Sequence, residues 1–260
     1  MTNRTFIAVA ALSGLAAFAP APAMAQQYVS GSAGFNFQAE SDNSGAFSSD
    51  FTTGDGVAVP AGTVLPAGTS LEWTSEFDSG QFLAGAYGWR LNDAVRVEGE
   101  ISYRQSDVDT HTDVAAGGGA IGAADAAVLI TGAAPLGVTV ADLVADGQGE
   151  LTSLGFAVNA YYDFPTSGAF GFYVGGGLGL ENIEIDFSPS ATSIIDDDQL
   201  VLFGQVMAGG AFAISETTSL YGGYRYRLSE DVETDVALVP AALDIENRAH
   251  ILEFGLRYSF

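Results

Sequence analysis

The C-terminal eleven residues, His250–Phe260, constrain the fold most, because every second side chain is large and apolar. The positions between them include Glu253 and Arg257, and a side-chain period of two predicts a β-strand. A strand of a soluble protein turns its charged face to water, whereas a strand of a transmembrane barrel turns its apolar face to lipid and its charged face to the lumen. The apolar column is Leu252, Phe254, Leu256, Tyr258 and Phe260.

Seven further segments show the same alternation. The clearest is Ala94–Ser106, where valine, isoleucine and tyrosine alternate with arginine, glutamate and serine. The predicted strands are Tyr28–Glu40, Gly80–Arg90, Ala94–Ser106, Leu151–Phe164, Phe170–Ile185, Leu200–Ile214, Leu220–Leu228 and the C-terminal segment.

The connections between these segments alternate between short turns and long loops. The long ones are Ser41–Ser79, Asp107–Glu150, Asp186–Gln199 and Ser229–Arg248. This asymmetry predicts an all-β fold: an eight-stranded antiparallel up-and-down transmembrane β-barrel with four long extracellular loops and short periplasmic turns. A soluble lipocalin-like barrel would need an apolar lumen, and the charges lie on the wrong face for that.

The N-terminus predicts secretion. Arg4 precedes an apolar run, Phe6–Phe18, that is too short to span a bilayer. Ala23-Met24-Ala25 fits a signal-peptidase site, so residues 1–25 are expected to be a signal peptide. Residues 26–260, starting at Gln26, would then form the barrel domain in the cell outer membrane.

The composition excludes several classes of function. All eight basic residues are arginine, against 32 acidic residues, and the net charge of −24 excludes a nucleic-acid partner. The absence of cysteine excludes disulfides and thiolate chemistry. A hydrophobic content of 48% argues against disorder.

Charged residues of the predicted strands should face the lumen. An eight-stranded barrel is wide enough only for side chains to fill, so these charges should pair with one another and plug it. On the last two strands, Arg225 and Arg227 should bracket the level of Glu253. The predicted lumen charges are Arg90, Arg96, Glu98, Glu100, Arg104, Asp163, Glu181, Arg225, Arg227, Glu253 and Arg257. The alternative is a narrow channel.

The sequence predicts no catalytic, cofactor or metal site. Barrel hydrolases need a histidine beside a nucleophile or an acid, and this chain has two histidines. We expect His111 to be exposed in a loop and His250 to lie at the rim of the outer face. The run Asp196-Asp197-Asp198 lacks the spacing of an EF-hand, and the acidic loops leave divalent-cation binding open.

Two loop motifs predict local order. Pro60-Ala61-Gly62-Thr63 is repeated as Pro66-Ala67-Gly68-Thr69, and each copy fits a β-turn. Thr139 begins a segment that fits a short helix ending near Gly147. Long ordered loops usually have a function, so these loops are the expected contact for an extracellular ligand.

Several segments resemble the eight-stranded outer-membrane barrel domain of the outer membrane protein A type, and within it the porin-like surface-antigen barrels of alphaproteobacteria. They are Gly88–Glu98, Asn159–Asp163, Phe172–Gly179, Gly223–Arg227 and Gly255–Phe260. The resemblance covers the strands and not the loops. It implies that Phe260, with Phe254, Leu256 and Tyr258, is read by the barrel-assembly machinery, and that outer-membrane lipid and lipopolysaccharide surround the barrel.

These observations predict a non-enzymatic protein of the outer membrane. It would be structural and surface-exposed, with a plugged polar lumen and loops that contact the surroundings. The rival function is a porin-like channel for small solutes.

Overall fold

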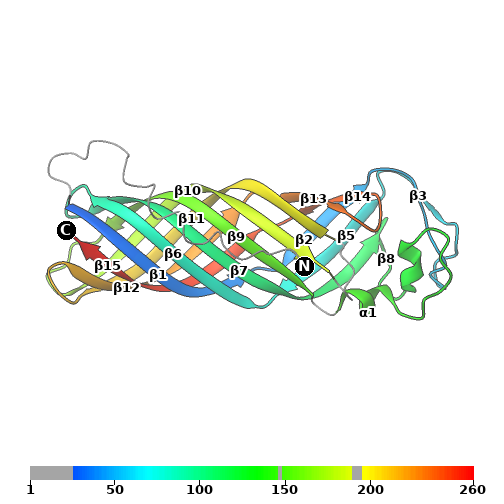
Figure 1. Cartoon of the computed structure of the whole chain (residues 1–260), viewed down its shortest axis with the longest axis horizontal. Helices are drawn as coiled ribbons and strands as arrows, with labels where there is room; N and C mark the ends of the chain where they lie inside the picture. Colours follow the sequence, from blue (N-terminus) through cyan, green and yellow to red (C-terminus); the bar gives the residue numbers. More distant parts are fainter. Residues whose placement is uncertain (1–25, 146–147, 189–194) are drawn as a thin grey trace, which may run out of the picture.

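Eight antiparallel strands close into a ring in the computed structural model, which describes residues 26–145, 148–188 and 195–260 (Figure 1). Around the ring the order is β1, β6, β7, β9, β10, β11, β12, β15 and back to β1. Their bounds are Gln26–Gln38, Ser79–Arg90, Val95–Ala116, Gly149–Asp163, Phe170–Phe187, Ile195–Ala213, Thr218–Ser229 and Arg248–Ser259. The predicted all-β barrel is therefore confirmed.

The first and last strands close the ring. Tyr28 of β1 is opposite Ser259 of β15, and the pairing continues without a break to Gln38 and Ala249. The predicted signal peptide lies outside the described residues and stays a prediction. None of the described helices is long and apolar enough to cross a bilayer.

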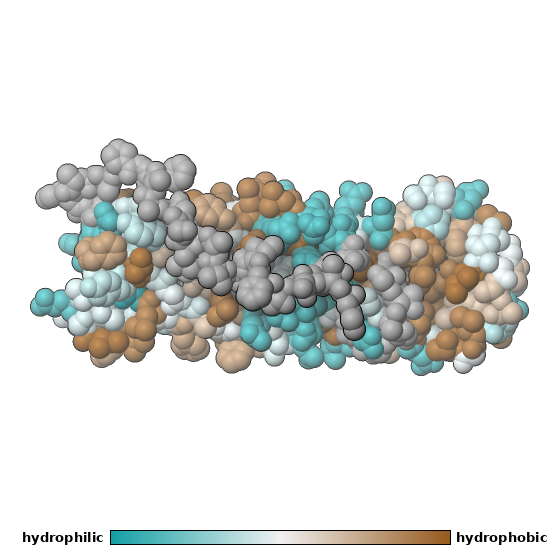
Figure 2. Space-filling model, in the orientation of Figure 1, coloured by the Kyte–Doolittle hydropathy of each residue, from teal (hydrophilic) through white to brown (hydrophobic). Residues whose placement is uncertain are grey.

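The outer face of the ring is apolar, and the inner face is charged. Leu178 is 74% exposed and Phe254 67%, whereas Arg96 and Arg227 are each 1% exposed. In Figure 2 hydrophobic side chains cover much of the barrel half, and a hydrophilic zone follows near the middle of the long axis. This distribution is the inverse of that in a soluble barrel and suits a lipid surround.

Aromatic residues gather at the end of the barrel that carries the short turns. The ring of Phe260 lies 6.4 Å from that of Tyr87, and the rings of Tyr162 and Phe164 lie 5.2 Å apart. At the opposite end, the hydroxyl of Tyr224 lies 2.6 Å from Nδ1 of His250. Such girdles mark the two interfaces of a membrane.

Much of the predicted loops is instead folded sheet. β2 (Ser41–Phe47), β5 (Ser70–Phe77), β13 (Val232–Val236) and β14 (Ala241–Ile245) form a sheet in the order β13-β14-β2-β5-β7. Short elements complete this part: β3 (Phe51–Thr52), β4 (Val64–Leu65), β8 (Gly119–Ala120), the 3-10 helix Ala126–Leu129 and α1 (Val140–Val144). We call residues 39–78, 107–145 and 230–247, with Phe187 of β10, the head.

The polarity of the strands inverts where they leave the barrel. On β10, Leu178 and Leu180 are exposed and Glu181 is fully buried. Further along the same strand Ile183 and Ile185 are buried, and the intervening positions are exposed and acidic or amide-bearing. The head strands therefore have the pattern of a soluble sheet. β13 alternates in the same way, with Val232 buried and Glu233 exposed.

The predicted turns of the head are present, and a helix follows Thr139 as expected but ends at Val144. Gly62 and Gly68 have φ of 78° and 85°, and the amide of Thr69 donates to the carbonyl of Pro66 at 3.0 Å. The side chain of Thr139 caps α1 by accepting a hydrogen bond from the amide of Asp142. Pro and Gly therefore direct the chain in this region as expected.

Asp125 organises the segment between β8 and α1. Its Oδ1 accepts hydrogen bonds from the amides of Ala127 and Leu136 at 3.0 and 2.8 Å, and its Oδ2 accepts one from Gly137 at 2.7 Å. The hydrogen bonds from Leu136, Ala127 and Gly137 lower the pKa of Asp125. One carboxylate thus holds together two stretches of backbone with little regular structure.

Glycine shapes the inside of the barrel wall at two positions of β10. A Cβ on Gly175 would overlap the Tyr161 ring, and one on Gly177 would overlap the Asn159 amide. Both large side chains come from β9, the neighbouring strand. The small residues of β10 therefore make room for the polar side chains that fill the lumen.

We predict that Gly175→Ala destabilises the barrel by about 1–3 kcal/mol, because Tyr161 must move in a filled lumen. Unfolding in urea, followed by the heat-dependent gel shift of the folded barrel, measures the change. Gly176→Ala is the matched control, since a Cβ there meets its nearest atom at 3.7 Å. Equal stability of the two variants would contradict the prediction.

We also predict that Asp125→Ala loosens the head and leaves the barrel intact, because three backbone amides lose their acceptor. Amide hydrogen exchange should show lower protection at Ala127, Leu136 and Gly137, with β10 as the internal control. Because folding lowers the pKa, the carboxylate stabilises the head above about pH 3.9, the ordinary value for aspartate. The difference between variant and wild type should vanish as the pH falls through the lower pKa of the folded state.

Candidate functional site

The lumen holds the charged side chains that the sequence assigned to it. Arg90 and Asp163 lie at the rim on the turn end, where their side chains are 32% and 19% exposed. The others lie inside the ring and are buried: Arg96, Glu98, Glu100, Arg104, Glu181, Arg225, Arg227, Glu253 and Arg257. They form three successive layers from the turn end to the head.

The first layer joins Arg96 to Asp163 and Glu98. Nε of Arg96 lies 3.1 Å from Asp163, and its Nη1 lies 3.5 Å from Glu98. The hydroxyls of Tyr28 and Tyr161 donate to Glu98 at 2.7 and 2.8 Å. The Arg96 guanidinium also stacks 3.6 Å from the centre of the Tyr161 ring. Charge, hydrogen bonds and stacking thus hold one cation in place.

Arg225 forms the second layer with two carboxylates. It binds Glu100 through both terminal nitrogens, and its Nη2 lies 3.1 Å from Glu253. The hydroxyl of Ser32 donates to Glu253 at 2.8 Å, and Gln205 accepts from Arg225 at 3.0 Å. Two buried anions therefore share this guanidinium, and Glu100 also lies 3.8 Å from Nη2 of Arg227.

Glu181 forms the third layer with two arginines. Its oxygens lie 2.9 Å from Nη2 of Arg104 and 3.0 Å from Nη1 of Arg227. The hydroxyls of Ser153 and Ser229 also donate to Glu181. This layer is the inverse of the second, with one buried anion between two cations.

The register changes one predicted pairing. On β12, Glu253 is opposite Gly223, and Arg225 is opposite Ile251. Arg227 therefore lies two further steps toward the head, where it binds Glu181. The expectation that Arg225 and Arg227 bracket Glu253 was wrong, because counting residues from the strand ends missed the offset between the two strands.

Arg257 is held by aromatic rings. Its guanidinium carbon lies 5.2 Å from the centres of both the Tyr28 and Tyr221 rings. Among the described residues, no carboxylate lies within 4.0 Å of it. The faces of these two rings therefore stabilise the cation.

Little free space remains between these layers. A cavity of about 10 Å³ lies among Ser32, Glu98, Arg225 and Arg257, which is room for about one water. Toward the head, Leu151, Ile183, Ile185 and Phe187 add an apolar layer above the charged ones. Layered charges and this apolar cover occupy the cross-section of the barrel.

Each of the two histidines contacts a hydroxyl group: His111 contacts that of Ser75, and His250 contacts that of Tyr224. His111 was expected to be exposed, and this expectation was wrong: β7 continues past Ser106, which places His111 on the inner face of the head at 6% exposure. Its Nδ1 lies 2.8 Å from Oγ of Ser75, and its ring packs 3.8 Å from that of Phe187. His250 is exposed at the rim, as expected.

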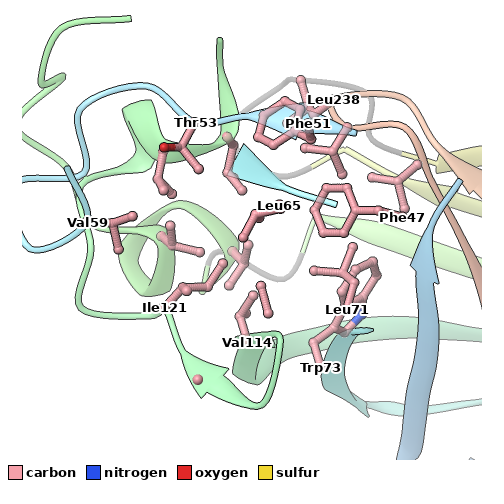
Figure 3. Close-up of a pocket in the computed structure, with 18 of the residues that line it drawn as sticks. Phe47, Phe51, Thr53, Val59, Leu65, Leu71, Trp73, Val114, Ile121 and Leu238 are labelled. Atoms are coloured by element: carbon pink, nitrogen blue, oxygen red, sulfur yellow. The ribbon is translucent and has the colours of Figure 1, made fainter. Parts of the chain in front are cut away.

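A second candidate site, an apolar pocket in the head, was not predicted. Its cavity has a volume of about 290 Å³, and Figure 3 shows Leu65 near its centre with Phe51 and Trp73 on opposite walls. The aromatic residues Phe47, Phe51 and Trp73 fall in segments that sequence reasoning assigned to a loop. The signal that could have revealed them is the alternation within Ser70–Phe77, where Leu71 and Trp73 are buried.

The four residues of the predicted assembly signal lie on the outer face of β15 and just beyond its end. Phe254, Leu256, Tyr258 and Phe260 are between 51% and 67% exposed. The amide of Phe260 donates to the carbonyl of Gln27 at 3.0 Å, which fastens the chain end to β1. Their recognition during assembly stays a prediction.

Several solved outer-membrane barrels match most of the chain at low sequence identity. Neisserial surface protein A is 16% identical with a TM-score of 0.44, over 90% of this chain and 97% of that one. Outer membrane protein OprG from Pseudomonas aeruginosa is 16% identical with a TM-score of 0.48, over 91% and 96%. The outer membrane protease OmpT from Escherichia coli is 9% identical with a TM-score of 0.40, over 90% and 97%. No curated protein matches the sequence.

The family comparison covers almost the whole chain. The model of the outer membrane protein beta-barrel domain matches residues 7–260, which includes every strand of the ring. This match agrees with the apolar outer face and locates the protein in the outer membrane, with lipid around the ring. The chain belongs to the outer membrane protein β-barrel domain family.

Proposed function

We propose that the barrel is a closed membrane anchor that presents the head at the cell surface and catalyses no reaction. The observation that carries this proposal is the packing of the second and third lumen layers. Arg225 and Arg227 reach across the lumen to carboxylates on β7 and β10, strands that are not their neighbours. Side chains that span the ring in this way leave no open path for a solute.

The energetics favour a permanent closure. Four glutamates and five arginines are buried in the lumen, and separating such a pair leaves a charge without its partner in a confined space. Opening a path would break several of these contacts together. The lumen is therefore better suited to hold the wall strands in register than to gate.

The rival function, a narrow channel for small solutes, needs mobile lumen side chains. Some lumen donors, such as Nη2 of Arg96 and Nε of Arg225, have no hydrogen-bond partner among the described residues. These atoms are the places where water would enter if the lumen conducted. Single-channel recording of the purified barrel in planar bilayers separates the two functions: silence supports the anchor, and steady conductance overturns it.

We predict unequal costs for the two partners of the second layer. Arg225→Ala leaves Glu253 without its cation and Glu100 with only the more distant Arg227, and it should cost about 3–5 kcal/mol of stability. Glu253→Ala should cost less, because Arg225 keeps Glu100. The double variant should be less damaged than the sum of the two single variants. Urea unfolding measures the stabilities, and bilayer recording shows whether either single variant conducts.

The control for this cycle is Arg248→Ala. Arg248 also pairs with a glutamate, Glu246, at 2.6 Å, but its side chain is 44% exposed, so its loss should cost at most about 1 kcal/mol. Two results together would mean that water screens the lumen. The effects of Arg225→Ala and Glu253→Ala would be strictly additive, and each would be as small as that of Arg248→Ala.

We further propose that Phe260 is part of a signal for the barrel-assembly machinery. Deleting it should lower the amount of inserted barrel in cells far more than the ~1–3 kcal/mol of lost apolar contact would explain. Phe172→Ala is the control, because Phe172 is 61% exposed on the same outer face and lies far from the chain end. Both variants should fold alike into lipid vesicles without the machinery. An equal loss in cells would contradict the signal.

A further inference from the structure

The pocket of the head is enclosed by elements from well-separated parts of the chain. Phe47 ends β2, Phe51 begins β3, Trp73 comes from β5 and Val114 from β7. The 3-10 helix and α1 contribute Val128 and Val140. Because the walls curve around one space, the feature is a concave site rather than a flat apolar patch.

We propose that this pocket binds a small neutral apolar molecule, of the size of a one- or two-ring hydrocarbon. A pocket of about 290 Å³ is roughly twice the volume of the ~150 Å³ apolar cavity that accepts benzene in an engineered protein, and lies near the lower limit for ligand sites. A hydrocarbon of this size would fill space that water fills poorly. This inference goes beyond the anchor function and does not depend on it.

The lining chemistry excludes a charged ligand. No carboxylate or guanidinium lines the pocket. The lining hydroxyl, on Thr53, donates to the carbonyl of Pro60 at 3.2 Å, and Nδ1 of the lining His111 is engaged with Ser75. A charged group that entered would lose its water and meet no carboxylate or guanidinium of opposite charge.

The charge around the pocket selects further against anions. The head contains no lysine or arginine, and acidic residues cover its outer faces, among them Asp50, Glu72, Asp109, Glu233 and Asp235. The negative field of these residues should repel carboxylates such as those of fatty acids. A neutral ligand meets no such barrier.

The two tryptophans of the chain allow a test with a built-in reference. Trp73 lines the pocket, whereas Trp89 lies at the turn end of the barrel against Tyr87. We would titrate the folded full-length barrel in lipid nanodiscs with naphthalene and follow both indole N–H signals by NMR. Binding in the pocket should shift the Trp73 signal to saturation, with only a small linear drift at Trp89 from partition into lipid.

Three variants and one anion sharpen the test. Val114→Phe places a ring in the pocket and should weaken naphthalene binding about tenfold or more, while Val57→Phe, at a head position that is 74% exposed and outside the lining, should not. Leu65→Phe is a second filling variant in case the first disturbs the head. 1-Naphthoate, of similar size but anionic, should bind about tenfold more weakly or worse.

Four results would overturn the proposal. Parallel, unsaturated shifts at Trp73 and Trp89 would mean partition into lipid only. Equal binding by the filling variants and Val57→Phe, or equal binding of naphthoate, would place the probe elsewhere. A shift of Trp73 with protein concentration alone would show that a second copy of the chain occupies the pocket. Each outcome can be read independently of bilayer conductance.

Discussion

The pairing of buried carboxylates with guanidinium groups inside a lipid-facing ring is the constraint on which the rest of the structure depends. An apolar outer face requires that the charged side chains of the same strands point inward, because side chains alternate. In so narrow a ring they cannot be hydrated individually. They are arranged so that Arg225 serves two anions and Glu181 serves two cations. Closure of the lumen and registration of the strands follow from the same contacts.

The strands of the ring could be predicted from the sequence, because side chains there alternate with a period of two between an apolar outer face and a polar inner face. Each wall strand combines an apolar outer column with polar or charged side chains on its inner face, and short turns separate the pairs, so strand number, order and facing could be derived. The register between neighbouring strands could not be derived. The offset between β12 and β15 shows why, because it places Arg227 beside Glu181 instead of Glu253. Alternation fixes which face a side chain occupies but leaves its height along the barrel to the neighbouring strands.

The head was missed for a physical reason. Its strands bury apolar side chains and expose acids, as in a soluble protein, and this reverses the criterion that identified the wall strands. Where β10 passes from one environment to the other, the buried column changes from Glu181 to Ile183 within a single strand. The pattern of an apolar outer face and a charged inner face ends where the strands leave the membrane. The predicted strands therefore ended there too, and His111 and the pocket aromatics were assigned to loops.

Continuity of the wall strands has a mechanical consequence. β7 runs from Val95 at the turn end to Ala116 in the head as one strand, with bulges in its pairing with β5, and β10 and β11 also extend past the ring's apolar belt. The part of β7 beyond Ser106 extends about 25 Å along the barrel axis, if its tilt is that usual for barrel strands, and it holds the pocket above the membrane part of the ring. These three strands connect the head to the ring, so the two should move together. The pocket is therefore held at a nearly constant distance and orientation above the bilayer.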